Sequence, residues 1–211
     1  MNRQKKLFER IYENPNAVWT RKIPPRELVG LVNQKIIKPC KAIDIGCGEG
    51  YYSVYLASRG FDVTGIDLSE RAIAYAKENA RMNKVNVRFL AKDIENLVDL
   101  DEKFDFVLEW GVMHHIMPVQ RKKYMKDVAG LLNNNGKYLS VCFNEQSPEF
   151  GGVGKKYRIS SLGTTLYYSS QNELEKLFSP KFNILDKKLI RMRGGHKGIS
   201  HIGNYFLMEK K

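Results

Sequence analysis

The stretch from Lys41 to Asp67 constrains the fold more than any other part of this chain. The short apolar run from Ala42 to Ile45 suits a buried parallel strand, and three alternate glycines end it. A helical pattern follows, and a second strand from Phe61 to Ile66 ends on the carboxylate of Asp67. Strand, glycine-rich loop, helix, strand and acid together predict an α/β fold with a cofactor site at the carboxyl edge of a parallel sheet.

The spacing of the glycines helps to identify the cofactor. Dinucleotide sites use G-x-G-x-x-G, with a pyrophosphate at the helix N-terminus. Here the pattern is Asp44-x-Gly46-x-Gly48-x-Gly50, with an acid two residues before the first glycine. A carboxylate at that place repels a pyrophosphate but pairs with an amine, so the loop favours a cofactor that carries positive charge and no phosphate.

The loop resembles the D/E-x-G-x-G-x-G loop of the class I S-adenosylmethionine (SAM)-dependent methyltransferases, and Asp67 matches their acid after the second strand. SAM has a sulfonium cation and an α-amino group and no phosphate. The resemblance implies that Asp67 holds the ribose hydroxyls, with Leu68 beside it. It also implies that the methionine end of SAM lies against Asp44, Gly46, Cys47, Gly48 and Gly50.

Two later segments extend the resemblance. A third strand, from Asn86 to Ala91, leads to Asp93 and Ile94, which match the family's adenine-binding acid and the residue that covers the ring. An alternative for Asp93 is a simple cap of the turn after the strand. The fourth strand ends at Glu109 and Trp110, which we expect to accept from the cofactor's ammonium group and to offer a π face to its cation, respectively.

The candidate catalytic residues are His114, His115 and Tyr157. A neutral imidazole could take a proton from a thiol or hydroxyl acceptor. The alternative, which we favour, is that the histidine pair shapes the loop and caps the next helix. The pair lacks partner ligands, so no metal site is expected. Residues 144–169 interrupt the strand–helix alternation, and in the resembling families an insertion here forms the substrate lid; Tyr157 and Arg158 are its candidate acceptor contacts.

The two ends of the chain add a cap and a hairpin. An amphipathic helix is predicted near Phe8, and the following Trp19-x-x-x-x-Pro-Pro pattern resembles a segment that covers the cofactor in thiol and thiopurine methyltransferases. Trp19 could equally be a packing anchor. Near the other end, strands at Phe182–Ile190 and Ile199–Met208 are too close in sequence for a crossover helix, so they are expected to pair antiparallel.

These elements predict one methyltransferase domain, 1–211, with a doubly wound, seven-stranded, mostly parallel sheet and an antiparallel last strand. Within it we expect an N-terminal helical cap (1–38), a SAM-binding half (39–143), a lid insertion (144–169) and a C-terminal helix and β-hairpin (170–211). The terminal hairpin supports the resemblance independently of the glycine loop.

Composition and charge limit the other possibilities. Three cysteines without metal-ligand spacing, no apolar run near the roughly 20 residues that span a bilayer and no signal peptide favour a cytoplasmic protein without a membrane partner. The net charge of +12 includes basic clusters around Arg10 and from Lys187 to Lys197. This positive charge indicates either a solvated surface that attracts an anionic small substrate or a surface that binds nucleic acid. No RNA-binding module accompanies it.

The function predicted from the resemblance is methyl transfer from SAM to a small-molecule thiol, hydroxyl or amine by direct in-line displacement, with S-adenosylhomocysteine as product. One alternative is an RNA or protein methyltransferase that uses the basic surface. Another is an interaction protein that binds SAM without catalysis.

Overall fold

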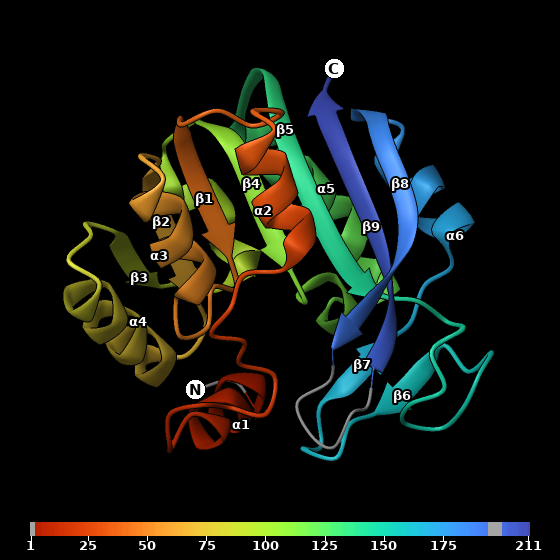
Figure 1. Cartoon of the computed structure of the whole chain (residues 1–211). Coiled ribbons are helices and arrows are strands. Elements are labelled where there is room, and N and C mark those ends of the chain that lie inside the picture. Colours follow the sequence, from red (N-terminus) through yellow and green to blue (C-terminus); the bar gives the residue numbers. More distant parts are fainter. Residues whose placement is uncertain (1–2, 194–199) are drawn as a thin grey trace.

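The computed structural model describes residues 3–193 and 200–211 (Figure 1). A seven-stranded sheet forms its centre, in the order β3-β2-β1-β4-β5-β9-β8. The strands are β1 (Lys41–Ile45), β2 (Asp62–Asp67), β3 (Arg88–Ala91), β4 (Phe104–Trp110), β5 (Leu132–Phe143), β8 (Phe182–Arg193) and β9 (Ser200–Lys210). The helices are α1 (Arg3–Ile11), α2 (Arg26–Asn33), α3 (Tyr51–Ser58), α4 (Glu70–Met82), α5 (Pro118–Leu131) and α6 (Gln171–Phe178), with 3₁₀ turns η1 (Ile94–Leu100) and η2 (Met113–His115).

The pairing of the strands confirms the predicted fold. Strands β1 to β5 run parallel, and β9 is antiparallel to both of its neighbours, β5 and β8. The predicted turn of the terminal hairpin, with Lys197 of the basic cluster and the expected strand start at Ile199, lies outside the described residues. The sheet is therefore the mostly parallel one that the glycine loop and the hairpin predict.

Alternation along the buried strands supplies two apolar layers. In β1, Ile43 and Ile45 face α5 and α6, and Ala42 faces the opposite layer with Leu28 of α2 and Leu56 of α3. Successive side chains of a strand point to opposite faces, so a strand covered on both sides reads as a continuous apolar run. The two layers hold the strand ends in fixed positions.

Two segments outside the sheet gather at the edge where the parallel strands end, and Figure 1 shows α1 and the β6–β7 pair at the end marked by the arrowhead of β1. Glu9 of α1 accepts from the backbone N–H of Glu70 (2.7 Å) and the hydroxyl of Ser69 (3.1 Å), so α1 adds a cap to α4. The insertion folds into a separate antiparallel pair, β6 (Tyr157–Ile159) and β7 (Thr165–Tyr167).

Arg158 of β6 does not contact an acceptor site, contrary to the expectation from sequence. Its side chain is buried, and its guanidinium donates to the carbonyls of Glu145 (2.8 Å) and Lys155 (2.7 Å) and stacks 3.7 Å from the ring centre of Tyr168. Arg158 therefore holds the insertion together from within.

Gly50 also has a packing role instead of the predicted cofactor contact. It caps the N-terminus of α3 with φ at 76°, and a Cβ there would lie 2.8 Å from both the Cβ of Ala76 and the ring of Phe89. Gly50 does not line the cavity described below. Its missing side chain lets α3, α4 and β3 pack closely.

We predict that Gly50→Ala lowers the free energy of unfolding by about 1–3 kcal/mol more than Gly163→Ala does. Both glycines have positive φ, so both substitutions introduce backbone strain, but a Cβ at Gly163 meets no atom within 4 Å. Urea denaturation of the two variants measures the difference. Equal losses would show that the contacts with Ala76 and Phe89 are not limiting.

Candidate active site

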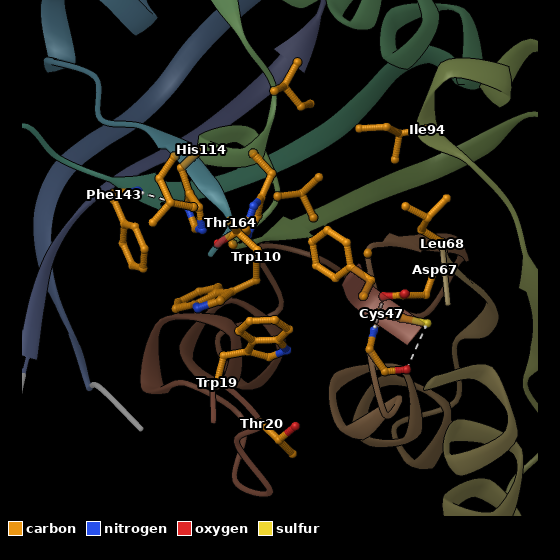
Figure 2. Close-up of a pocket in the computed structure, with 18 of the residues that line it drawn as sticks. Trp19, Thr20, Cys47, Asp67, Leu68, Ile94, Trp110, His114, Phe143 and Thr164 are labelled. Atoms are coloured by element: carbon orange, nitrogen blue, oxygen red, sulfur yellow. Dashed lines mark hydrogen bonds between the residues drawn. The ribbon is translucent and has the colours of Figure 1, made fainter. Parts of the chain in front are cut away.

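A cavity of about 1610 Å³ lies at the carboxyl edge of the sheet (Figure 2). Residues of the N-terminal segment, the loops after β1, β2 and β4, and the insertion line it. Single-ligand pockets measure about 300–1,000 Å³, so this cavity has room for two small molecules side by side.

The first group of lining residues forms what we term the acidic half: Asp44, Asp67, Leu68, Asp93, Ile94 and the glycine loop. Asp44, at the end of β1, is buried and accepts a hydrogen bond from the Ser53 hydroxyl of α3 at 2.6 Å. Burial and, to a smaller extent, the nearby Asp67 carboxylate raise the pKa of Asp44 to about 7, against the opposing effect of the hydrogen bonds from Ser53. Ser53 was not identified from the sequence; its signal is a hydroxyl in the first turn of the helix after the loop.

Asp67 ties the glycine loop to β2. Its Oδ2 accepts from the N–H of Gly48 and its Oδ1 from the N–H of Ser69, both at 2.9 Å. Burial raises the pKa of Asp67 to about 6, although these backbone hydrogen bonds lower it. The N–H of Cys47 donates to the carbonyl of Ile66 at 2.9 Å, so a second bond joins the loop to the same strand.

The first two glycines of the loop are required by close contacts within the protein. A Cβ at Gly46 would lie 2.2 Å from the Cγ2 of Val112, and a Cβ at Gly48 would lie 2.9 Å from the Tyr12 hydroxyl. Both have positive φ. The loop therefore fits between the N-terminal segment and the loop after β4.

The residues after β3 lie where the sequence predicts. Asp93 and Ile94 line the cavity beside Leu68. Asp93 also caps η1, because its Oδ1 accepts from the N–H of Glu95 at 3.0 Å. The cap that the sequence left as one alternative is thus present, and Asp93 lines the cavity as well, so adenine binding stays a prediction.

Glu109 does not reach the cavity, which corrects the prediction that it binds the cofactor's ammonium group. It is fully buried and accepts from the N–H of Met113 (2.8 Å) and the hydroxyls of Tyr124 and Tyr138. Burial raises its pKa, and these hydrogen bonds oppose that rise. Neighbouring residues of a strand point to opposite faces, so Trp110 lines the cavity and Glu109 fixes the loop beneath.

The N-terminal segment closes one side of the cavity. Trp19 lines it and donates from Nε1 to the Tyr12 hydroxyl at 2.8 Å, so its position fits both a packing anchor and a cavity wall. Glu49, inside the glycine loop, accepts from the N–H of Ala17 (3.0 Å) and the hydroxyl of Thr20 (2.7 Å). Sequence reasoning missed Glu49, whose partners are about 30 residues away.

The second group of lining residues, termed the aromatic half, includes Trp110, His114, Phe143, Phe150 and His201. His114 is buried, and its Nδ1 accepts from the N–H of Phe143 at 3.4 Å. His115 lines the cavity toward the N-terminal segment, with its ring centre 5.4 Å from that of Phe8. Burial lowers the pKa of both imidazoles, that of His115 to about 4, so both rings are neutral at pH 7.

Tyr157, the third candidate catalytic residue, lies outside the cavity. Its side chain is 63% exposed, and its ring packs edge-on against Tyr167 of the paired strand, with centroids 4.9 Å apart.

The structure identifies Arg121 of α5 as a residue that holds the loops around the cavity together. Its guanidinium donates to the carbonyl of Met113 (3.0 Å) and the hydroxyl of Ser169 (2.6 Å), joining the loop after β4 to the insertion.

Residues 3–193 and 200–211 contain neither a metal-binding cluster nor a membrane-spanning helix. No cluster of three or more His, Cys, Asp or Glu side chains in this part of the chain is arranged to hold a metal ion. No helix among the same residues has the length and apolar character needed to cross a membrane.

Comparison with known proteins agrees with this geometry. Residues 42–136 match the family described as methyltransferase domain. A ubiquinone biosynthesis O-methyltransferase of Coxiella burnetii is 34% identical over 122 residues, which cover 58% of this chain and 51% of that protein. The chain thus spans about half the length of this relative.

Two further proteins match over more of the chain. The Pelagibacter ubique ubiquinone biosynthesis O-methyltransferase is 32% identical over 171 residues, covering 73% of this chain and 70% of that protein. A Burkholderia thailandensis 1,6-didemethyltoxoflavin-N1-methyltransferase, solved with 1,6-didemethyltoxoflavin and S-adenosylhomocysteine, shares the fold with a TM-score of 0.78 at 22% identity, covering 99% and 87% of the two chains. Because the match to the Pelagibacter relative extends over more than two thirds of that protein, and the acidic glycine loop lies where the resemblance requires, this chain belongs to the class I SAM-dependent methyltransferases.

Proposed function

We propose that this chain transfers the methyl group of SAM to a small-molecule thiol, hydroxyl or amine by direct in-line displacement. One observation carries the proposal: a single cavity joins an acidic half, which suits a cation, to an aromatic half, which suits an organic acceptor. SAM supplies a methyl group already activated by its sulfonium charge. The protein's main task is then to position two molecules and to exclude water.

The acidic half fits the cofactor. Asp44 and the loop backbone hold the methionine end, Asp67 accepts from the ribose hydroxyls, and Asp93 with Ile94 binds the adenine. The raised pKa values of Asp44 and Asp67 result from desolvation, with like charge adding to that of Asp44. A bound cation relieves this cost, because an opposite charge favours the ionised carboxylate.

The histidines support a positioning role and not a role as general base. With Nδ1 of His114 accepting from Phe143, the proton of the neutral ring is on Nε2, so the ring offers the cavity a donor. His115 also stays neutral at pH 7 and packs against the N-terminal segment. Neutral rings beside the sulfonium site avoid repulsion between two cations.

The relatives favour a small acceptor. Their names describe an O-methyltransferase of ubiquinone biosynthesis and an N1-methyltransferase of 1,6-didemethyltoxoflavin. Because the two names specify different acceptor atoms, they support the small-molecule class and leave the atom open. The alternative of an RNA or protein acceptor depends on the +12 charge alone.

We predict that Asp67→Ala weakens SAM binding by at least about tenfold, because hydrogen bonds to a charged group contribute about 1.5–3 kcal/mol. The variant should also lose about 1–3 kcal/mol of stability, since the N–H groups of Gly48 and Ser69 lose their acceptor. Calorimetric titration and urea denaturation measure the two effects. Asp62→Ala, at the exposed start of the same strand, is the matched control. Unchanged SAM affinity in Asp67→Ala would remove this residue from the site.

The raised pKa values of Asp44, about 7, and Asp67, about 6, predict a dependence on pH. A carboxyl group whose pKa is raised on folding binds its proton more tightly in the folded state. It therefore stabilises the fold fully below the unfolded pKa of about 3.9, and this stabilisation is lost as the pH rises through the folded pKa values of about 6 and 7. A cationic cofactor binds the ionised forms, so SAM affinity should rise by about tenfold or more from pH 5 to pH 7.5. Asp44→Asn should reduce this slope and keep the hydrogen bond from Ser53. A slope equal to that of the unmodified protein would contradict the assignment.

The proposed function is tested by incubating the protein with methyl-labelled SAM and a cell extract. The label is expected in a low-mass, solvent-extractable product, with formation of S-adenosylhomocysteine. Label in acid-precipitable material that is lost after ribonuclease or protease treatment would identify a macromolecular acceptor. SAM binding without any S-adenosylhomocysteine would support a non-catalytic protein.

A further inference from the structure

The aromatic half of the cavity has a wall of stacked rings. His114 and Phe143 lie face to face, with centroids 3.9 Å apart and planes within 7°. His201 of β9 continues the wall, with its centroid 4.3 Å from that of Phe143, and Phe150 of the insertion lies 5.7 Å beyond it. Figure 2 shows His114 and Phe143 together, on the opposite side of the view from Asp67, Leu68 and Ile94. Because these rings cover one another's faces, the wall offers ring edges to the cavity, and a flat aromatic ligand can pack against them in the edge-to-face arrangement.

The wall is uncharged but lies in a positive field. Burial and, to a smaller extent, the guanidiniums of Arg158 and Arg21 together lower the pKa of His201 to about 4. The same Arg21 guanidinium acts on Tyr52, beside Asp44. Arg21 is therefore close enough to both halves to influence a group between them.

Basic side chains gather at the rim of the cavity next to the wall. Arg21 comes from the N-terminal segment, and Arg191 comes from β8, where its partner in β9 is Ile202, next to His201. Lys22 and Arg26 also line the cavity. The carboxylate of Glu27 lies in the same segment but is paired with Arg26 at 3.0 Å. The charge of this rim is opposite to that of the acidic half.

From this arrangement we propose that the methyl acceptor is a planar aromatic molecule that carries an anionic group such as a carboxylate. The face of the acceptor ring packs against the ring edges of the wall formed by Phe143, His114 and His201, and the anionic group is directed toward Arg21 and Arg191. This inference depends on the proposed function, because it specifies the acceptor of the same site. Guanidinium groups match the fork of a carboxylate, and a basic rim concentrates anions at the cavity mouth.

The test compares two ligands that share a ring system and differ in charge, 2-naphthoate and 2-naphthamide. Each is titrated by calorimetry into the protein saturated with S-adenosylhomocysteine, so that no turnover occurs. Naphthoate is expected to bind up to about fivefold more tightly at low salt, the upper limit for one ion pair at an exposed rim. Added salt should reduce that preference, because exposed charges are screened.

Variants locate the two parts of the site. Arg21→Gln and Arg191→Gln should each reduce the preference for naphthoate, and the double variant should abolish it with naphthamide affinity unchanged within about twofold. Phe143→Ala should weaken both ligands. Arg81→Gln is the control for the arginine change, since Arg81 is exposed on α4, is paired with Glu78 and does not line the cavity.

Equal affinity for the two ligands, no measurable binding of either, or a preference that survives the double variant would overturn the proposal. Binding of S-adenosylhomocysteine, measured in the same titrations, separates this outcome from failure of the proposed function. A protein that binds S-adenosylhomocysteine and methylates a small molecule but shows no preference for the anion has the proposed function with a neutral acceptor. A protein that does not bind S-adenosylhomocysteine has neither.

Discussion

The hydrogen bond from the N–H of Gly48 to the carboxylate of Asp67 is the interaction on which the rest of the site depends. It closes the glycine loop across the ends of two adjacent parallel strands, which the apolar layers on both faces of the sheet hold in register. With the loop closed in this way, Glu49 is placed to accept from Ala17 and Thr20. The N-terminal segment is thereby fastened over the cavity. A single acid at the end of β2 thus influences both the floor and the cover of the site.

The cavity orders its charges along its length. Buried carboxylates are costly unless they are paired or neutralised, and their raised pKa values express that cost. The neutral histidines lie in the aromatic half of the cavity, and the guanidinium groups lie at the rim of the cavity next to that half. Such an order favours a cation at one end and an anion at the other.

Local patterns in the sequence predicted the sheet, the loop and the hairpin, because each is set by periodicity, glycine spacing or the length of a connection. These patterns failed where the direction of a side chain decides whether it faces the cavity. Glu109 and Trp110 are neighbours in one strand, so only one of them can face the cavity, and the sequence does not show which. Gly50 matches the loop pattern but serves the packing of Ala76 and Phe89. Tyr157 and Arg158 lie in an irregular insertion, where no period indicates the buried face. Glu49, Arg121 and His201 depend on contacts between distant segments.

The N-terminal segment links the two halves of the cavity. Trp19 and Tyr12 lie against the glycine loop and His115, whereas Arg21, two residues beyond Trp19, acts on His201 of the aromatic half. Glu49 holds the intervening Thr20 with a hydrogen bond of 2.7 Å. Because so few residues separate these contacts, one short segment contributes side chains to both halves of the cavity, and the hydrogen bond from Thr20 to Glu49 fixes that segment to the glycine loop.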